Sequence, residues 1–189
     1  EGRPEIVPKR AEHVRVTMDV LNKLSKKNYD KMREKLAALE MHTPEMLHQV
    51  VDTIHQKALL DFKFAVMYAG LCKELSCNYE KWTFLSFDHA PDSDAVSVAW
   101  VVDKPDGTPD RKSVKCKSLD HARQTVTKMF FKNPLLTMCQ QQFNSWAGAT
   151  SDTAPTTDED GKELSEADKE EVRIKAKLML IGNVQFVGH

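Results

Sequence analysis

Apolar residues recur at helical spacing along much of the chain, most clearly over residues 43–75. Thr43 and Pro44 are a typical helix start, because threonine caps free backbone N–H groups and proline suits the first helical position. Asp61 is a second candidate cap within the stretch. The two apolar faces are Leu47, Val50, Val51, Ile54 and Ala58, then Phe64, Tyr68, Leu71, Cys72 and Leu75. The stretch therefore predicts a helical hairpin whose apolar faces need neighbours to bury them.

Residues 10–40 predict a similar hairpin. Its first helix spans residues 10–24, and its second runs from the candidate cap Ser25 to about residue 40. Leu24 and Tyr29 flank that cap with the spacing of a hydrophobic staple, in which two apolar side chains pack across a helix start. Successive hairpins of ~34–47 residues are typical of helical-repeat proteins, in which each unit buries its apolar face on the next.

Residues 76–118 interrupt this pattern. A β-branched run over residues 96–102 is followed by turn residues and a second run, which predicts either a small β-hairpin or an irregular loop. Helical spacing returns over residues 120–131 with Ser118 as a candidate cap, and it restarts at Asn133 and Pro134. Residues 147–163 are small, polar and acidic, which favours a flexible linker. Ser165 is the candidate cap of a last helix, whose first turns are acidic.

We therefore predict an all-α fold of stacked antiparallel helical hairpins, a HEAT-like α-solenoid with an irregular insertion at about 76–118. Residues 1–9 hold two prolines, Pro4 and Pro8, and predict an extended arm. Residues 10–189 predict a single domain, with repeat one at 10–40, repeat two at 43–75 and repeat three at 119–189. Because the last helix has no clear C-terminal cap, we expect the third repeat to be truncated.

Composition narrows the protein class only slightly. The chain has 189 residues, of which 41% are hydrophobic and 29% are charged, as is usual in globular domains. The net charge is −1, so binding to nucleic acid would depend on local basic clusters. The sequence shows no secretory signal, no membrane span and no C-x-x-C pair, which indicates reduced thiols in a cytosolic or nuclear protein.

No pattern of catalytic residues stands out. The phosphate-binding, dinucleotide-binding, serine-hydrolase and metalloprotease motifs are absent, so we expect neither an enzyme nor a cofactor. His48, Asp52 and His55 share a helix face and have side chains of the metal-ligating kinds. That face lies opposite the apolar stripe, so we interpret it as a solvated polar face and predict no metal site. Cys72 and Cys139 lie on apolar faces, where core packing is expected.

Basic residues cluster around the predicted first hairpin and again over residues 111–128. From the first cluster we single out three candidate contacts with RNA phosphates: Lys26, Lys31 and Lys35. Both clusters also fit an ordinary charged surface. Leu21, Leu24 and Tyr29 have two interpretations. They pack within the first hairpin, which periodicity alone favours, or they form an apolar knob flanked by lysines, which is typical of a protein-binding hot spot.

Four segments occur in a characteristic order: residues 20–32 (VLNKLSKKNYDKM), the hairpin 43–75, residues 134–143 (PLLTMCQQQF) and residues 180–188 (LIGNVQFVG). Together they resemble the middle domain of eukaryotic translation initiation factor 4 gamma. The resemblance implies an all-α HEAT domain, of which this chain would hold about the first two hairpins and most of the third. It also implies a scaffold that binds a DEAD-box RNA helicase of the initiation factor four-A type and helps to recruit mRNA to the small ribosomal subunit.

The resemblance implies a set of helicase-binding residues. They are Leu21, Leu24 and Tyr29, with Lys23 and Lys27 at the rim and Phe62 and Lys63 in the turn between the two helices of 43–75. Tyr29 stands where the family usually has phenylalanine. The resemblance further implies contact with mRNA, a cap-binding protein held by a segment outside this chain, no membrane partner and a cytoplasmic location. The alternatives are an RNA-binding HEAT module and a related middle domain of mRNA decay or nuclear cap binding.

Overall fold

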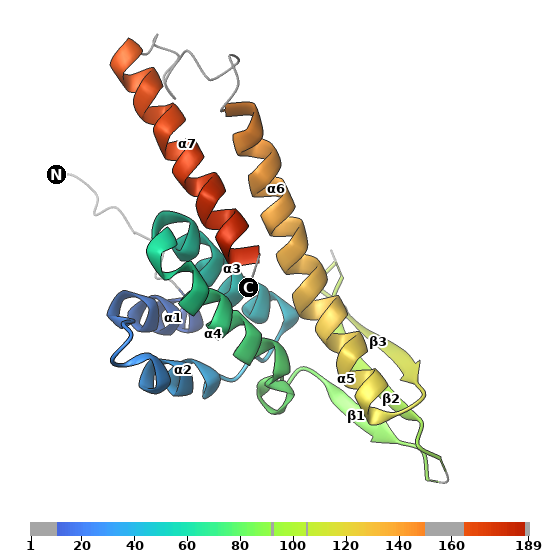
Figure 1. Cartoon of the computed structure of the whole chain (residues 1–189). Helices are drawn as coiled ribbons and strands as arrows, with labels where there is room; N and C mark the ends of the chain where they lie inside the picture. Colours follow the sequence, from blue (N-terminus) through green and yellow to red (C-terminus); the bar gives the residue numbers. More distant parts are fainter. Residues whose placement is uncertain (1–10, 92, 105, 150–164, 188–189) are drawn as a thin grey trace, which may run out of the picture.

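The computed structural model of the protein describes residues 11–91, 93–104, 106–149 and 165–187. These residues form stacked helical hairpins from which a small sheet projects (Figure 1). The predicted architecture of helical hairpins is confirmed, and the insertion is a folded antiparallel sheet. The predicted arm at 1–9 lies outside the described residues. So does most of the predicted linker at 147–163, although its first residues belong to a helix.

Two helical hairpins form the body of the molecule. The first consists of α1 (Glu12–Lys23) and α2 (Tyr29–Ala37), and the second of α3 (Pro44–Leu60) and α4 (Ala65–Cys77). Because α1 packs on α3 and α2 packs on α4, the apolar faces of one hairpin meet those of the other. Large side chains of this core that are less than 2% exposed include Leu36, Leu47, Ile54, Tyr68 and Leu71.

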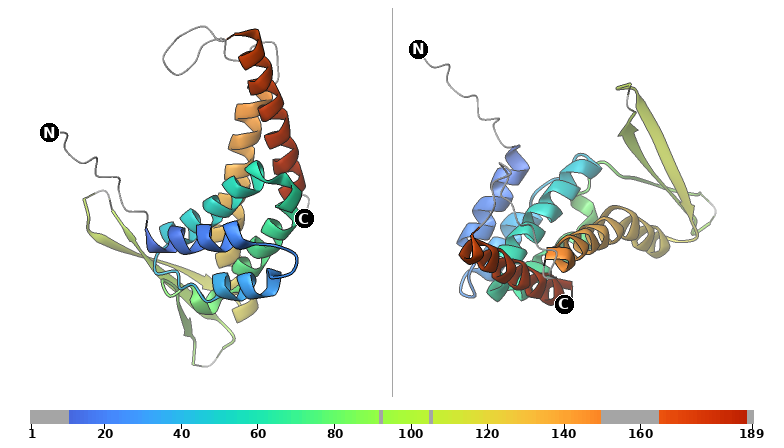
Figure 2. Two further views of the ribbon diagram at one scale, coloured as in Figure 1. Left: turned by 90° about the vertical axis from the view of Figure 1, so that its left-hand side faces the viewer. Right: turned by 90° about the horizontal axis from the view of Figure 1, so that it is seen from above.

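The third hairpin is longer than the first two. α5 (Leu119–Thr127) continues through a π-helical turn (Lys128–Lys132) into α6 (Asn133–Ala149). The predicted restart at Asn133 is wrong, because Asn133 has helical angles (φ −63°, ψ −48°). The wider π-helical turn before it accommodates Pro134, which has no backbone N–H to donate. α7 (Glu166–Val187) returns beside α6 and packs against α3 and α4 (Figure 2).

Helix starts follow the predicted caps where the signal is local. Thr43 accepts a hydrogen bond from a backbone N–H of the first turn of α3 (3.1 Å), with Pro44 in the first helical position. Ser118 caps α5 and Ser165 caps α7 in the same way, each at 3.2 Å. The prediction for Asp61 is wrong, because a short 3-10 turn precedes α4 and no backbone group of the described residues is capped by the Asp61 side chain.

The insertion is a three-stranded antiparallel sheet in the order β1-β2-β3. β1 (Ser86–His89) was not predicted, whereas β2 (Val96–Asp103) and β3 (Pro109–Cys116) form the predicted hairpin. Gly107 has a positive φ of 78° in the turn between them, which only glycine adopts easily. α5 packs against β2 and β3, and the buried residues of the sheet include Val96, Val98 and Cys116.

Aromatic side chains join the sheet to the helical body. Trp82 is only 2% exposed, lies edge to face with Tyr79 (5.5 Å between ring centres) and stacks on Phe84 (6.2 Å). Phe130 continues the cluster by contacting Phe84 (5.3 Å) and Trp100 on β2 (5.2 Å). Aromatic rings on the body, the sheet and the third hairpin therefore pack together and anchor the sheet.

A buried polar cluster holds α7 against the body. On α3, the His55 ring nitrogen Nε2 lies 3.1 Å from the side-chain oxygen of Asn183 on α7. The Asn183 amide donates to the backbone carbonyl of Cys139 on α6 (2.9 Å), and the Phe186 ring packs on the imidazole (5.4 Å between centres). One asparagine therefore ties all three helices together where they meet.

This cluster corrects the predicted role of one histidine. We predicted a solvated face for His48, Asp52 and His55, but His55 is fully buried because α7 covers that side of α3. His48 is exposed and Asp52 is half-buried, so the three side chains do not share one environment. Within the described ranges, no group of three or more histidine, cysteine or acidic side chains is arranged to hold a metal ion.

Candidate protein-docking surface

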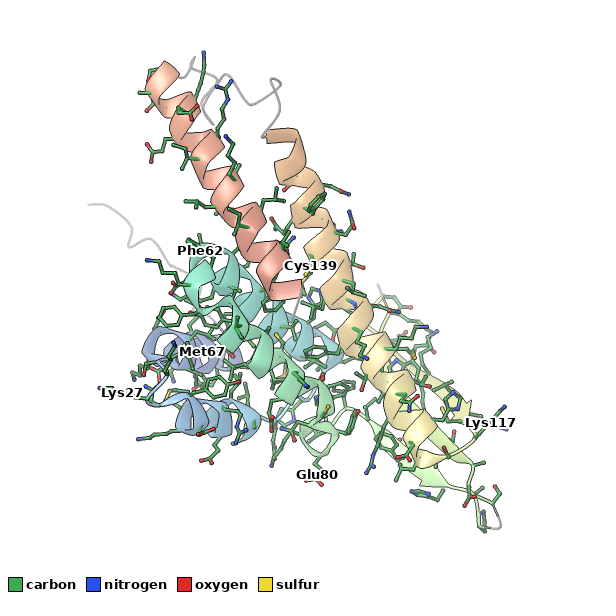
Figure 3. All side chains as sticks on the ribbon, in the orientation of Figure 1. Lys27, Phe62, Met67, Glu80, Lys117 and Cys139 are labelled. Atoms are coloured by element: carbon green, nitrogen blue, oxygen red, sulfur yellow. The ribbon has the colours of Figure 1, made fainter. Side chains whose placement is uncertain are left out.

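The two turns of the helical body lie on one edge of the molecule: residues 24–28 between α1 and α2, and residues 61–64 between α3 and α4. Figure 1 and the left view of Figure 2 both place these turns near each other, because α1 stacks on α3. We call the two turns, with the first residues of α4, the hairpin edge. Figure 3 shows Lys27, Phe62 and Met67 on this side of the molecule, and Lys117 on the opposite side at the sheet.

The first turn is closed by Asn28 and not by the predicted cap Ser25. The Asn28 amide nitrogen donates to the carbonyl of Lys23 (2.6 Å), and its side-chain oxygen accepts from the Ser25 N–H (2.7 Å). α2 therefore begins at Tyr29, and the predicted staple of Leu24 and Tyr29 across a Ser25 cap is wrong, since the helix starts later. An asparagine with both side-chain groups bonded to the backbone fixes the shape of this turn.

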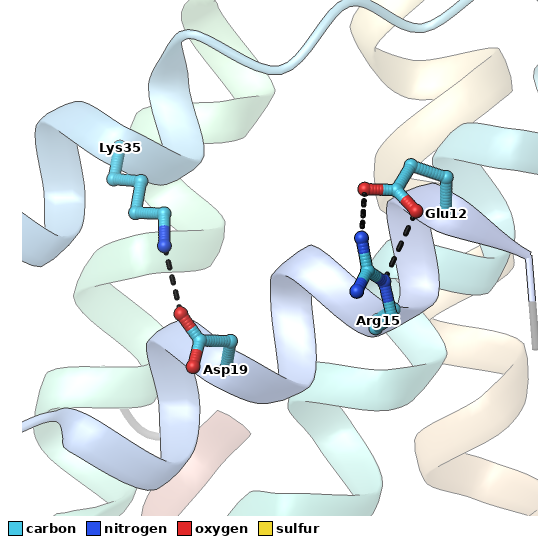
Figure 4. A network of polar contacts seen from close by, with 4 residues as sticks. All are labelled: Glu12, Arg15, Asp19 and Lys35. Carbon is cyan, nitrogen blue, oxygen red and sulfur yellow. Dashed lines mark hydrogen bonds and ion pairs between the residues drawn. The ribbon is translucent and has the colours of Figure 1, made fainter.

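Asp19 connects the two helices that meet at this turn. Its carboxylate accepts from Lys23 on its own helix (2.6 Å) and from Lys35 on α2 (2.7 Å), and Figure 4 shows the second contact. Hydrogen bonds from Lys23 and Lys35 lower the pKa of Asp19 to about 2. The charges of these two lysines are thus partly balanced. Lys27 is exposed and makes no ion pair with the described residues, so its charge is available to a partner.

The structure buries the two leucines that the sequence offered as an apolar knob. Leu21 is 2% exposed and Leu24 is 9% exposed, and both belong to the main core. They face inward because α1 lies against α3 and because the turn folds back over the end of α1. The expectation of an exposed knob is therefore wrong in this structure, and only Tyr29 of the three is half-buried.

The second turn carries exposed apolar residues that sequence reasoning missed. Phe62 is half-buried and Lys63 is exposed. On either side of them in the sequence, Leu60 is 66% exposed and Val66 is 55% exposed. Their positions outside the apolar stripes of α3 and α4 were the available signal in the sequence.

The described residues offer no catalytic arrangement. A mostly apolar hollow of about 310 Å³ lies between α4, α6 and the end of α7, with Cys72 and Cys139 in its lining. Burial raises the pKa of both thiols, that of Cys139 to about 11, so neither is a thiolate nucleophile at neutral pH. The prediction that both cysteines pack in the core is confirmed.

No helix in the described ranges is long and apolar enough to cross a membrane.

Stacked helical hairpins with a charged and partly apolar edge place the chain in the class of α-helical repeat scaffolds. Within that class, the chain belongs to the MIF4G domain family, which matches residues 14–189. This match confirms the family that the four sequence segments suggested.

Curated relatives are similar to the chain over most of its length. A eukaryotic translation initiation factor 4 gamma from Dictyostelium discoideum is 27% identical over 171 residues, which is 89% of this chain and 12% of that protein. Eukaryotic translation initiation factor 4 gamma 3 from Mus musculus is 25% identical over 194 residues, covering 98% of this chain and 10% of the relative. The chain therefore spans about a tenth of the length of these relatives.

A solved structure supports the fold. The crystal structure of the MIF4G domain of Trypanosoma cruzi translation initiation factor EIF4G5 is similar with a TM-score of 0.50 and 15% sequence identity. The similarity covers 94% of this chain and 58% of that chain. At this level of identity the likeness concerns the path of the helices, and it carries no statement about partners.

Proposed function

We propose that the chain is a translation initiation scaffold that binds a DEAD-box RNA helicase of the initiation factor four-A type through the hairpin edge. The observation that carries the proposal is the composition of this edge, where Lys27 and Lys63 make no ion pair with the described residues and Leu60 and Val66 are exposed at the second turn. Charged residues at a rim steer association, while apolar residues supply the contact area. The family match to initiation factors favours this partner over those of mRNA decay or nuclear cap binding.

The proposed contacts divide into two layers. Lys23, Lys27, Lys63, Tyr29 and Phe62 face or border the solvent and contact the helicase directly. Leu21 and Leu24 lie beneath them and hold the turn in place, because both side chains belong to the core. In the complete protein the scaffold would help to bring mRNA to the small ribosomal subunit in the cytoplasm, with a cap-binding protein held by a segment outside this chain.

Charge reversal on the hairpin edge tests the helicase contact. We expect Lys27→Glu with Lys63→Glu to weaken binding to the purified helicase about tenfold, because two attractive charges become repulsive. Both side chains are exposed and make no ion pair with described residues, so the fold should be unaffected. Affinity is measured by titration calorimetry, and circular dichroism monitors the fold.

The matched control carries the same charge change on the opposite side of the molecule, at Lys115→Glu with Lys117→Glu. Both lysines are exposed at the end of β3, and Lys117 lies far from Lys27 (Figure 3). The control should bind the helicase as the unmodified chain does. Equal affinity of the edge variant and the control would remove the hairpin edge from the proposal.

RNA contact is a second candidate function, supported by part of the predicted basic cluster. Lys26 and Lys31 are exposed without an ion pair among the described residues, whereas Lys35 is held by Asp19. If Lys26 and Lys31 contact phosphates, Lys26→Ser with Lys31→Ser should reduce the salt dependence of oligouridylate binding by a slope of about 1.4, roughly 0.7 for each lost contact. An unchanged slope, measured by fluorescence anisotropy without helicase, would exclude these contacts.

A further inference from the structure

Tyr29 rests against a glycine in the middle of α4. A Cβ atom placed on Gly70 would lie 2.5 Å from the Tyr29 hydroxyl oxygen and 3.5 Å from the ring carbon that bears it. The first distance is shorter than real Cβ contacts allow, whereas the second is an ordinary van der Waals contact. The hydroxyl group therefore occupies the space that any side chain at position 70 would need.

The backbone does not explain this glycine. Gly70 lies inside α4 (Ala65–Cys77), and of the described glycines Gly107 is the one with a positive φ. Glycine is a poorer helix former than alanine, because it loses more conformational freedom on folding. The atoms that a Cβ at Gly70 would approach within 4 Å are both atoms of Tyr29. A glycine that weakens its own helix is thus accounted for by one neighbouring side chain.

Tyr29 itself is held by packing and not by a polar contact. Its ring packs against the main core, and its hydroxyl makes no hydrogen bond with the described residues. Burial raises the pKa of this phenol, while the nearby positive charge of Arg33 opposes the rise. The depth of the ring is therefore set by the surface of α4 on which it rests.

We propose that Gly70 is a positioning residue of the hairpin edge: it lets Tyr29 sit deep against α4 and thereby sets the position of the first turn of α2. Tyr29 is the first residue of α2 and follows Asn28, which closes the preceding turn, so a displacement of the ring moves the exposed lysines of that turn. The inference rests on the proposed function in one respect, namely that the hairpin edge is the surface that binds the helicase.

A second explanation would be that α2 and α4 approach closely through their backbones. In that case a methyl group at position 70 would be harmful whatever residue stands at position 29. Under our proposal the harm depends on the hydroxyl alone, because the ring carbon leaves room for a methyl group at 3.5 Å. Replacing Tyr29 with phenylalanine should therefore make alanine tolerable at position 70.

The test compares four proteins: the unmodified chain, Gly70→Ala, Tyr29→Phe and the double variant. Gly70→Ala should weaken helicase binding about fivefold, because the Tyr29 ring is pushed outward. Tyr29→Phe alters a proposed contact residue, so its measured affinity is the reference for the double variant and is not assumed to equal that of the unmodified chain. The double variant should regain the affinity of Tyr29→Phe, and its thermal melting temperature should not lie below that of Tyr29→Phe.

Spectrophotometric titration of the tyrosines decides the positioning without any helicase. The difference between the unmodified chain and Tyr29→Phe gives the titration of Tyr29 in the unmodified chain. The difference between Gly70→Ala and the double variant gives it in Gly70→Ala. In Gly70→Ala the pKa of Tyr29 should move down toward the ordinary value of about 10, because the phenol becomes more exposed. An unchanged pKa together with a double variant as weak as Gly70→Ala would overturn the inference. If the unmodified chain binds no helicase, the proposed function fails, and the titration and melting temperatures alone decide whether Gly70 positions Tyr29.

Discussion

Replacing Leu21 and Leu24 together with alanine is expected to unfold the domain, and not merely to weaken helicase binding. Both side chains lie in the core, at 2% and 9% exposure. Truncating a buried leucine to alanine costs about 2–5 kcal/mol, because apolar contacts are lost and a cavity remains. The double change thus removes most or all of the stability of a domain that is worth about 5–15 kcal/mol in total.

Urea denaturation followed by circular dichroism measures this effect directly. The double variant should show either no cooperative transition or a midpoint far below that of the unmodified chain. The charge-reversed variant at Lys27 and Lys63 is the control, since its exposed side chains should leave the midpoint unchanged. A double leucine variant that unfolds within about 1 kcal/mol of the unmodified chain would show that the two leucines are not core residues in solution.

The two leucines show what helical periodicity can and cannot predict. The spacing of Leu21 and Leu24 places them on one side of a helix, but it does not say whether that side faces another helix or a partner protein. That distinction depends on α3, which stacks on α1 from a later part of the chain. The same periodicity predicted the helical hairpins correctly, because the spacing of apolar residues along a helix depends on that helix alone.

The helix caps also show which predictions from the sequence were reliable. Thr43, Ser118 and Ser165 were predicted as caps and are confirmed, because a cap bonds to the backbone of the next few residues. Ser25 was displaced by Asn28, whose two hydrogen bonds close the turn before the helix begins. At Asp61, a 3-10 turn delays the start of α4.

The candidate site was only partly visible in the sequence. The resemblance implied the lysines and Phe62, and the structure leaves the lysines exposed and Phe62 half-buried. The exposed Leu60 was missed, although it lies outside the apolar stripe of α3. The contact between Tyr29 and Gly70 joins two different hairpins, so no pattern within either hairpin could have revealed it.

The stability of the α7 attachment should fall as the pH falls, and His55 is the expected cause. Burial lowers the pKa of His55 below its ordinary value of about 6.5, although Asn183 and the nearby Asp52 oppose the shift. Cys139 on α6 and Asn183 and Phe186 on α7 face the imidazole, and none of them carries a charge at this pH. A protonated His55 would therefore be a charge in a mostly neutral, buried environment.

The hydrogen bonding of the imidazole ring also favours its neutral form. Nε2 lies beside the Asn183 oxygen, while Nδ1 is buried without a hydrogen-bond partner among the described residues. A neutral imidazole with its proton on Nε2 fits this arrangement, because Nδ1 then lacks only a donor. Protonation would add an N–H group at Nδ1 with no described acceptor, and burying such a group costs free energy.

The sign of the pH effect follows from linkage. The unfolded state takes up the proton at a higher pH than the folded state, so the contribution of His55 to stability is fully present above about pH 6.5. It is lost progressively as the pH falls from about 6.5 through the lower folded-state pKa. For one proton the unfolding free energy changes by at most about 1.4 kcal/mol per pH unit.

Two glutamine variants on the same helix separate this effect from general acid destabilisation. His55→Gln keeps an N–H donor for Asn183 and cannot be protonated, so its unfolding free energy should depend less on pH between 7 and 5. His48→Gln removes an exposed histidine two turns earlier and should retain the pH dependence of the unmodified chain. Identical urea-unfolding profiles for His55→Gln and the unmodified chain across this range would contradict the prediction.

The location of His55 also determines which part of the molecule responds first. The imidazole lies where α7 meets α3 and α6, so the buried charge is relieved once α7 separates, without loss of the contacts between the first two hairpins. Amide hydrogen exchange should therefore accelerate over residues 166–187 at a pH where α1 to α4 remain protected. Equal acceleration in α3 and α7 would show that the domain opens as one unit, in which case His55 acts on global stability and not on the attachment of α7.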